Sequence, residues 1–370
     1  MSHLGFPSTP KSVSIALTGR CNLSCSYCFY AGEMAALTDL STAQWLAVFA
    51  RLKALGVMDA TLTGGEALTR PDFFELVDGL IAHRMRYSLL SNGTRFDEAV
   101  VREFDKGKRR LRLDSIQISI DGSCAEVHDR HRPHSFERAL RGLKLLKAEG
   151  FPLTVRVTIH PDNIGDLEAT ARLLLEEVGL PSFSTNEAFP MGAGCGNQGE
   201  TCLTPMREME AMRAVARLQE RYPGRVTAQA GPLAKRRAYA EMEEARATGK
   251  RPATWTMGYL TSCGCVFSRI DILHDGTIVP CHVLHRLALG NVLTDDLGEI
   301  WRTHPTLAAL RGRRSIPMRE VPGCDGCKWA EFCNGSCPGL AHELTGDFNR
   351  ANPADCYRAF VAKTGGIHAL

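Results

Sequence analysis

Three cysteines stand within eight residues near the start of the chain, in the segment CNLSCSYC. Cys21, Cys25 and Cys28 are separated by three residues and then by two. Closed zinc sites take four cysteine or histidine ligands, and iron–sulfur clusters are also held by cysteine thiolates. The nearby His3 does not have the spacing of a metal ligand. The segment therefore offers three ligands to a metal centre and leaves a fourth position open.

A second group of eight cysteines lies between residues 263 and 356. Its members are Cys263, Cys265, Cys281, Cys324, Cys327, Cys333, Cys337 and Cys356. Two fully ligated [4Fe–4S] clusters require this number of thiolates. Residues 321–340 have too little apolar periodicity for a core of their own, so we expect a metal centre to hold them. A zinc site with four ligands within 324–337 is the alternative.

Composition favours metal chemistry over disulfides. The chain of 370 residues has 14 cysteines, yet its N-terminus, MSHLGFPSTPKS, lacks the pattern of a signal peptide. No apolar run approaches the roughly 20 residues of a membrane span. We therefore expect a cytoplasmic protein, and in a reducing cytosol clustered cysteines indicate metal or redox sites. The net charge of +3 is too small to indicate nucleic acid or an acidic membrane as a partner.

The first half of the chain alternates between two patterns. Six β-rich runs are predicted at 12–19, 59–65, 86–93, 114–122, 153–160 and 181–189. Five stretches with helical spacing are predicted at 41–56, 71–84, 96–107, 134–149 and 164–178. This alternation predicts an α/β fold of parallel β/α units, curled into a sheet or barrel by right-handed crossovers.

Polar and glycine residues follow these predicted strands. They are Thr63-Gly64-Gly65-Glu66, Ser91-Asn92-Gly93, Asp121-Gly122, Asn186-Glu187 and the three-cysteine segment itself. Because sites in parallel β/α folds are built at the carboxyl ends of the strands, we expect these groups to form one site.

The pattern changes along the second half. A glycine-rich loop at 190–203 precedes helical stretches at 204–222 and 232–248, and cysteine-rich sequence with little periodicity begins at 260. We predict three parts: a partial barrel at 1–203, a helical bridge at 204–259, and a cysteine-rich domain at 260–370.

The spacing CxxxCxxC on the loop after the first strand resembles that of the radical S-adenosylmethionine (SAM) superfamily, and Gly64-Gly65-Glu66 resembles its GGE motif. The resemblance implies a partial (β/α)6 barrel in which Cys21, Cys25 and Cys28 hold a [4Fe–4S] cluster. SAM would chelate the remaining iron, and its reductive cleavage would give a 5′-deoxyadenosyl radical that abstracts hydrogen from a substrate.

The same resemblance implies further SAM-binding positions. Glu66 would bind the amino group of SAM, and the glycines would allow close backbone approach. The family usually has proline after GGE, where this chain has Ala67. The other implied positions are Tyr27, Asn92, Ser119, Arg132 and Ala188.

The C-terminal cysteines resemble the SPASM extension of radical SAM enzymes. The resemblance implies one auxiliary [4Fe–4S] cluster on Cys263, Cys265, Cys281 and Cys337, and a second on Cys324, Cys327, Cys333 and Cys356. Only Gly264 separates Cys263 from Cys265. One of these two could instead be free, which would leave an open iron for substrate.

The resemblance implies an enzyme that abstracts hydrogen from a ribosomally synthesised peptide and then installs a thioether or carbon–carbon crosslink or epimerises a residue. A SPASM enzyme acting on a small molecule or cofactor precursor is the alternative within enzymes. A non-catalytic iron–sulfur electron carrier is the alternative of another class. The implied partners are the peptide and an electron donor such as flavodoxin or ferredoxin. Because we expect the barrel to start by residue 12, no fused leader-binding domain is expected before it. Either a separate protein binds the leader, or the barrel binds the substrate directly.

Five residues are candidates for the chemistry. His282 stands where the sulfatase-maturing branch has an aspartate that acts as a base, and a histidine can serve at neutral pH. Cys124 and Cys195 follow predicted strands, where a thiol could donate a hydrogen atom to a substrate radical. Glu187 and Asp121 could act as a base or bind an amine. Structural roles are the alternative for all of them, and Cys202 is expected to be structural.

Overall fold

The computed structural model describes residues 6–32, 34–250 and 257–369. The chain divides into two compact units. The N-terminal unit comprises residues 11–233 and 272–276, and the C-terminal unit comprises the described parts of 1–10, 234–271 and 277–370. The division falls at residue 233, so it splits the predicted helical bridge at 204–259, of which 251–256 lie outside the described residues.

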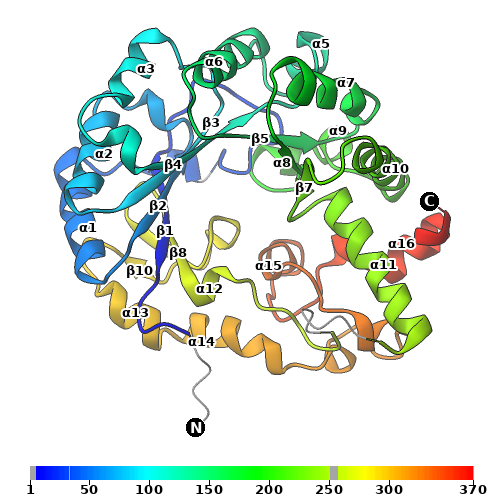
Figure 1. The fold of residues 1–370 in the computed structure, drawn as a ribbon. Helices are drawn as coiled ribbons and strands as arrows, with labels where there is room; N and C mark the ends of the chain where they lie inside the picture. The colour runs from blue at the N-terminus through cyan, green and yellow to red at the C-terminus, as the bar shows by residue number, and fades with distance from the viewer. Residues whose placement is uncertain (1–5, 33, 251–256, 370) are drawn as a thin grey trace. The chain divides into compact units, whose positions relative to one another are not determined.

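Seven parallel strands, adjacent in the order of the sequence, form the sheet of the N-terminal unit (Figure 1). Their bounds are β1 Ser12–Thr18, β2 Asp59–Gly64, β3 Arg86–Ser91, β4 Leu113–Ser119, β5 Leu153–Ile159, β6 Phe183–Glu187 and β7 Val226–Ala228. The first six are the predicted strands. The prediction missed β7, whose three residues, Val226–Ala228, are too few for a periodic signal.

The connecting helices of this unit are amphipathic. Their bounds are α1 Thr42–Ala54, α2 Phe73–Ala82, α3 Glu98–Phe104, α4 Arg109–Arg112, α5 Ala125–His128, α6 Phe136–Ala148, α7 Leu167–Arg172, α8 Ala193–Gly196, α9 Gln198–Thr201 and α10 Pro205–Arg221. In α1, a capping box between Ser41 and Gln44 starts the helix, and the face with Trp45 and Phe49 is buried. Burial of such faces against the strands makes the core of the unit.

Two predicted stretches differ locally from the structure. The helical stretch at 164–178 is α7 flanked by a 3-10 turn at Ile164–Asp166 and a π-helical turn at Leu173–Glu177. The predicted loop at 190–203 contains the single turns α8 and α9. Neither change alters the order of strands and helices, and the predicted α/β class with parallel β/α units is confirmed.

The C-terminal unit has fewer regular elements. They are α11 Pro232–Thr248, α12 Cys265–Ser268, β8 Arg269–Ile272, β9 Thr277–Val279, β10 Gly290–Asn291, α13 Leu297–Thr303, α14 Pro305–Gly312, α15 Pro338–Thr345 and α16 Tyr357–Thr364. Strands β9 and β10 pair antiparallel. Leu260, which precedes α12, forms a small core with Met318, Val321 and Ala330 from the segment between α14 and α15. This core packs directly against Cys324, Cys327 and Cys333.

No helix in the described part of the chain is both long enough and apolar enough to span a membrane.

Candidate active site

The loop after β1 carries the first cysteine group. At the end of β2, Gly64 and Gly65 allow the backbone to pack against the first residues of this loop. The Gly65 N–H donates to the Thr18 carbonyl at 2.8 Å, and the Glu66 N–H donates to the Arg20 carbonyl at 2.9 Å. A Cβ on Gly64, at φ +126°, would lie 2.4 Å from the Thr18 oxygen, and one on Gly65 would lie 2.2 Å from the Arg20 oxygen. Only glycine fits both positions, so this motif fixes where Glu66 meets the cysteine loop.

The three thiols of Cys21, Cys25 and Cys28 are close enough to influence one another. Burial raises the pKa of Cys25 to about 11, with smaller contributions from Cys28 and Cys21, against the lowering effect of the Arg132 guanidinium. Burial also raises the pKa of Cys21. Without a metal the thiols of Cys21 and Cys25 are therefore protonated at neutral pH, and metal binding must release their protons. Three convergent thiols with no fourth fit a [4Fe–4S] cluster that keeps one iron open.

Glu66 is a buried carboxylate surrounded by neutral donors. It is 1% exposed and accepts bonds from Ser91 Oγ at 3.0 Å, the Asn92 N–H at 2.8 Å and the Leu68 N–H at 3.3 Å. Burial raises its pKa although these bonds oppose the shift. Among the described residues no cation lies within 4.0 Å of it to form an ion pair. An ammonium group would complete this site, as the GGE resemblance implies.

Asn92 connects the end of β3 to the cysteine loop. Its Nδ2 donates to Asn22 Oδ1 at 3.0 Å and lies 3.9 Å from Cys21 Sγ. Asn22 Nδ2 in turn donates to Thr94 Oγ1 at 2.9 Å. This short network orients the first half of the loop toward Glu66.

Asp121 orients the second half of the loop. The fully buried carboxylate accepts bonds from the Tyr27 hydroxyl, from Arg132 Nε at 2.5 Å and from the Thr158 N–H at 2.7 Å. Arg132 Nη1 also reaches Cys25 Sγ at 3.8 Å. Burial alone would raise the pKa of Asp121, but Arg132 and the other donors hold it below its usual range. A carboxylate so fully bonded positions its neighbours and is a weak base, so this geometry favours the structural alternative for Asp121.

Two histidines that the sequence analysis did not select lie against Tyr27. His131 Nδ1 lies 2.6 Å from Ser26 Oγ, and its Nε2 lies 2.8 Å from Asp162 Oδ2. His160 is fully buried, its ring stacks on Tyr27 at 6.0 Å between centroids, and burial lowers its pKa to about 4. These histidines fix the loop between its second and third cysteines.

The nitrogen and oxygen atoms of His131, His160 and Asp162 lie within 4.8 Å of one another, the one such group in the described part of the chain. Both ring nitrogens of His131 already have protein partners, so a metal ion would have to displace them. We therefore interpret the group as packing. The sequence signals that could have found it are His131 beside Arg132 in DRHRPH and the HPD stretch at 160–162, directly after β5.

The segment after β6 is bonded directly to the cysteine loop. The Ala193 N–H donates to the Cys28 carbonyl at 3.0 Å, and Asn197 Nδ2 donates to the Ser26 carbonyl at 2.9 Å. Cys195 lies between these two contacts in α8, where it is exposed, with its thiol 3.0 Å from the Pro190 carbonyl. The candidate hydrogen donor Cys195 is thus carried on a segment fixed to the cluster loop.

The remaining candidates of this unit lie at the carboxyl ends of strands, and the hydrogen bonds given for the described residues do not join them to one another. Cys124 is half-buried directly before α5, and it contributes to the lowered pKa of Glu126. Glu187 is the buried last residue of β6, Ala188 follows it with its N–H bonded to Ile159, and Ser119 ends β4 half-buried. Their roles stay predictions.

In the C-terminal unit the structure brings together Cys263, Cys265, Cys281 and Cys337. The neighbouring thiols of Cys263 and Cys281 raise the pKa of Cys265, and Cys265 in turn lowers the pKa of Cys263 to about 6. Burial raises the pKa of Cys337 to about 12, with Cys281 and Cys263 contributing to the shift. Both members of the closely spaced pair therefore face the same group.

The other four cysteines form a separate group. Burial raises the pKa of Cys333 to about 11, with contributions from Cys324, Cys356 and Cys327. Among the described residues no three cysteine sulfurs lie within 4.8 Å of one another. Four thiolates around one zinc ion would be about 3.8 Å apart, given Zn–S bonds of about 2.3 Å. The sulfurs of the two groups of four cysteines are spaced more widely than this, so they fit [4Fe–4S] clusters better than zinc. The four cysteines in each group are those that the SPASM resemblance implies.

His282 directly follows Cys281, shortly after β9, and it is oriented by Asp271. His282 Nδ1 lies 2.7 Å from Asp271 Oδ2, and the same oxygen accepts the His282 N–H at 2.9 Å. Asp271 also pairs with Arg269 Nε at 3.1 Å and is buried. Such a carboxylate fixes the ring orientation and directs Nε2 away from it.

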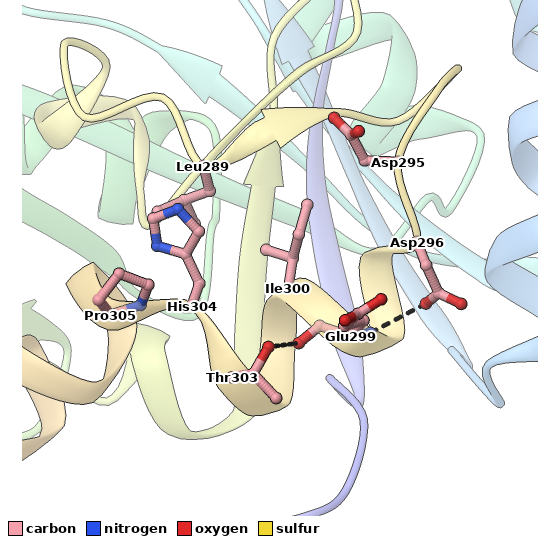
Figure 2. A pocket seen from close by; sticks show the side chains of 8 residues that line it. All are labelled: Leu289, Asp295, Asp296, Glu299, Ile300, Thr303, His304 and Pro305. Atoms are coloured by element: carbon pink, nitrogen blue, oxygen red, sulfur yellow. Dashed lines mark hydrogen bonds between the residues drawn. The ribbon is translucent and has the colours of Figure 1, made fainter.

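A cavity of about 350 Å³ in the C-terminal unit contains no thiol in its lining (Figure 2). Three of the residues around it carry carboxylates: Asp295, Asp296 and Glu299. Asp296 caps α13 by accepting the Glu299 N–H at 2.9 Å, and Asp295 accepts the Asn291 N–H at 2.7 Å. These acids serve the local fold, and the chemistry-bearing residues lie elsewhere.

The comparisons with known proteins agree with both cysteine regions. Residues 15–174 match the model of the radical SAM superfamily, and residues 263–328 match SPASM, an iron–sulfur cluster-binding domain. The chain is a radical SAM enzyme with a C-terminal SPASM domain. These domains imply a SAM-binding [4Fe–4S] cluster and auxiliary clusters, which the thiol groups described above fit.

Two curated relatives align over nearly the whole chain. An AdoMet-dependent heme synthase of Methanosarcina barkeri is 26% identical and covers 96% of this chain and 99% of its own. A PqqA peptide cyclase of Rhizobium meliloti is 28% identical, with 95% and 88% covered.

Solved structures share the fold. Streptococcus suis SuiB bound to precursor peptide SuiA superposes with a TM-score of 0.71 at 16% identity, covering 95% of this chain and 76% of that one. The enzyme anSMEcpe with bound AdoMet gives 0.69 at 19% identity, with 96% of each chain covered.

Proposed function

We propose that this protein is a peptide-modifying enzyme that abstracts hydrogen from a ribosomally synthesised peptide. The reaction would end in a thioether or carbon–carbon crosslink, or in epimerisation of one residue. The observation that supports this most is the alignment with PqqA peptide cyclases over 95% of the chain. That alignment includes both cysteine regions, so it concerns the whole catalytic arrangement rather than one domain.

The residues of the N-terminal unit have roles that suit this proposal. Cys21, Cys25 and Cys28 would hold the cluster, and the Glu66 carboxylate would bind the SAM ammonium. When bound, the cluster and SAM supply an electron and a source of the 5′-deoxyadenosyl radical. Arg132 keeps a positive charge beside Cys25, where it offsets the negative charge of thiolate ligation.

Some contacts of this site resist movement of the loop during the reaction. Tyr27 and Arg132 share Asp121, and His131 joins Ser26 to Asp162. These bonds leave the loop few alternative conformations, which is the preorganisation that orientation-dependent chemistry needs.

Candidate groups for later proton and hydrogen transfers follow from the same geometry. We assign His282 Nε2, oriented through Asp271, as a base that takes a substrate proton. Cys195, exposed beside the cluster loop, would donate a hydrogen atom if the reaction is an epimerisation. Glu187 would bind a substrate amine.

A small molecule or cofactor precursor is the second candidate substrate. The specific observation in its favour is the heme synthase, which aligns over 99% of its length. A non-catalytic electron carrier is less suitable, because a carrier needs neither an open cluster site nor a buried carboxylate beside it.

Anaerobic reconstitution tests the proposal in two stages. The first stage measures iron and the reductant-dependent formation of 5′-deoxyadenosine, for which we expect about twelve irons per chain. Iron without SAM cleavage would support the carrier, and zinc in its place would reject both. A matched Cys25→Ala protein controls for cleavage that does not depend on the site.

The second stage offers candidate substrates in deuterated water. A peptide encoded near this gene should lose two hydrogens on crosslinking, or exchange one carbon-bound hydrogen for deuterium, with the corresponding rise in mass, on epimerisation. Turnover of a heme precursor with no change in any such peptide would favour the small-molecule alternative. An electron donor such as flavodoxin or ferredoxin, a separate leader-binding protein and a cytoplasmic location complete the proposal.

A further inference from the structure

Arg313 is a buried cation whose guanidinium is only partly satisfied by the protein. Its side chain is 0% exposed, and it follows α14 in a 3-10 turn. Nη2 donates to the Arg350 carbonyl at 3.2 Å, whereas Nε and Nη1 have no hydrogen-bond partner. Among the described residues no carboxylate forms an ion pair with it. A buried charge in this state is costly unless something else in its surroundings is negative.

Backbone hydrogen bonds connect the turn of Arg313 with the loops that carry both auxiliary groups. Just before Cys263, the Leu260 N–H donates to the Ile316 carbonyl at 2.9 Å, and the Thr261 N–H donates to the Asn334 carbonyl, between Cys333 and Cys337, at 2.7 Å. On its other side Arg313 is bonded to Arg350.

The stretch after Arg350 is bonded to the same loop. The Asn352 N–H donates to the carbonyl of Gly335, midway between Cys333 and Cys337, at 2.8 Å. Burial lowers the pKa of Arg313 to about 10, and the opposing negative neighbours are Cys337 first and then Asp347. These bonds place Arg313 beside the loop between Cys333 and Cys337, and the neighbour that most favours its charge is Cys337, a member of the first auxiliary group.

Two other arginines of the same unit show what is particular about Arg313. Arg311 is buried too, and its Nη2 also has no partner, but Nε and Nη1 donate to the Val266 and Trp301 carbonyls at 2.8 Å and the guanidinium stacks on Trp301. Arg269 lies near the same cysteines, and Asp271 pairs with it at 3.1 Å. Arg313 alone of the three has neither arrangement.

We propose that Arg313 is the counter-ion of the auxiliary cluster on Cys263, Cys265, Cys281 and Cys337, and that its charge raises the reduction potential of that cluster. A [4Fe–4S] core of charge 2+ on four thiolates is a dianion, and one-electron reduction adds a further negative charge. A fixed guanidinium in low dielectric stabilises the reduced form more than the oxidised form. The proposal concerns the cluster rather than the substrate, and it holds whichever substrate is correct.

A redox titration of the full-length chain tests this role. The background is the Cys21→Ala, Cys25→Ala, Cys28→Ala protein, which should keep only the two auxiliary clusters, or about eight irons. The two clusters are titrated anaerobically with a low-potential reductant and followed by electron paramagnetic resonance. In Arg313→Gln we expect the reduction potential of one of the two clusters to fall by about 59 mV. At a fixed potential this corresponds to a fall of about tenfold in the ratio of reduced to oxidised cluster, for transfer of one electron. The second wave is the internal control and should stay in place.

Two further variants separate charge from packing. Arg313→Lys keeps the charge and should restore most of the shift, whereas Arg311→Met should lower stability and move neither wave. If Arg313→Gln loses about four irons and Arg313→Lys regains them, the counter-ion role is also supported. Unchanged waves with about eight irons in Arg313→Gln would overturn the proposal. Equal iron loss in the glutamine and lysine variants would overturn it as well, because packing alone would then explain the residue.

Discussion

The N-terminal unit surrounds three thiols with many polar side chains, whereas the C-terminal unit has eight thiols in two groups of four. Beside Cys21 and Cys25 lie Asn92, Arg132 and, through them, Glu66 and Asp121. The groups in the C-terminal unit are completed by cysteine itself. An open site needs side chains for the ligand that completes it, and a closed site does not.

The two regions also differ in what holds the chain in place. The cysteine loop of the N-terminal unit rests on a parallel sheet and on the buried Asp121–Arg132 pair. Residues 321–337 rest on the small core of Leu260, Met318, Val321 and Ala330, which packs on cysteines. We infer that metal in the first region serves chemistry, and that metal in the second also serves folding.

Removal of the first three thiols should give the largest effect and test whether the regions are independent. The Cys21→Ala, Cys25→Ala, Cys28→Ala protein should lose SAM cleavage entirely and keep about eight of twelve irons. Iron analysis and 5′-deoxyadenosine assays measure both quantities. Loss of all iron would contradict the comparison, because it would mean that the auxiliary groups depend on the first cluster. Cys202→Ala is the matched control and should change neither.

Asp121→Asn should destabilise the N-terminal unit by about 3–5 kcal/mol, because it leaves the Arg132 guanidinium buried without its carboxylate. Chemical denaturation of the metal-free protein measures this loss. The control is Asp162→Asn, whose carboxylate is partly exposed and lies 2.8 Å from Nε2 of the buried His131. Because that carboxylate keeps contact with water, a smaller loss of about 1 kcal/mol is expected there. Similar losses in both variants would contradict the role of Asp121 as the centre of this network.

Glu66→Gln should weaken SAM binding about 10- to 100-fold, or about 1.4–2.8 kcal/mol, because an amide replaces a charge-assisted partner of the ammonium. Burial raises the pKa of Glu66, so wild-type affinity should fall as pH drops through that raised value and the carboxylate takes up a proton. The raised pKa also means that the folded protein favours the neutral Glu66 carboxyl. Glu66 therefore contributes to the stability of the fold at low pH, and this contribution is lost as pH rises through the raised pKa.

Equilibrium binding of SAM to the reconstituted protein across pH checks both parts of this prediction. The glutamine variant should show weaker binding without that pH dependence. Equal affinity in the two proteins would exclude Glu66 from the SAM site, and an unchanged pH profile in the variant would assign the titration to another group.

The sequence predicted much of this arrangement, because strands, turns and ligand spacing are local signals. The six strands, the GGE motif and the cysteine spacing were all available from neighbouring residues. The partners of Asp121 were not, since Tyr27 lies 94 residues away in the chain. The contact of His131 with Ser26 spans 105 residues and likewise depends on how the strands are placed. Positions at strand ends were predictable, whereas the bonds between them required the fold.

The smallest effect is expected at Cys195, which tests whether the N-terminal unit uses a fourth thiol. Cys195 is exposed, and its thiol bonds only to a carbonyl in its own turn among the contacts described. Cys195→Ala should therefore change stability by less than about 0.5 kcal/mol and leave SAM cleavage within about twofold, or about 0.4 kcal/mol. If the reaction is an epimerisation, the variant should still abstract hydrogen but lose the product that carries deuterium from solvent, as peptide mass spectrometry would detect. Loss of iron in this variant would instead make Cys195 a cluster ligand, and the distinction between an open three-thiol site and two closed sites would fail.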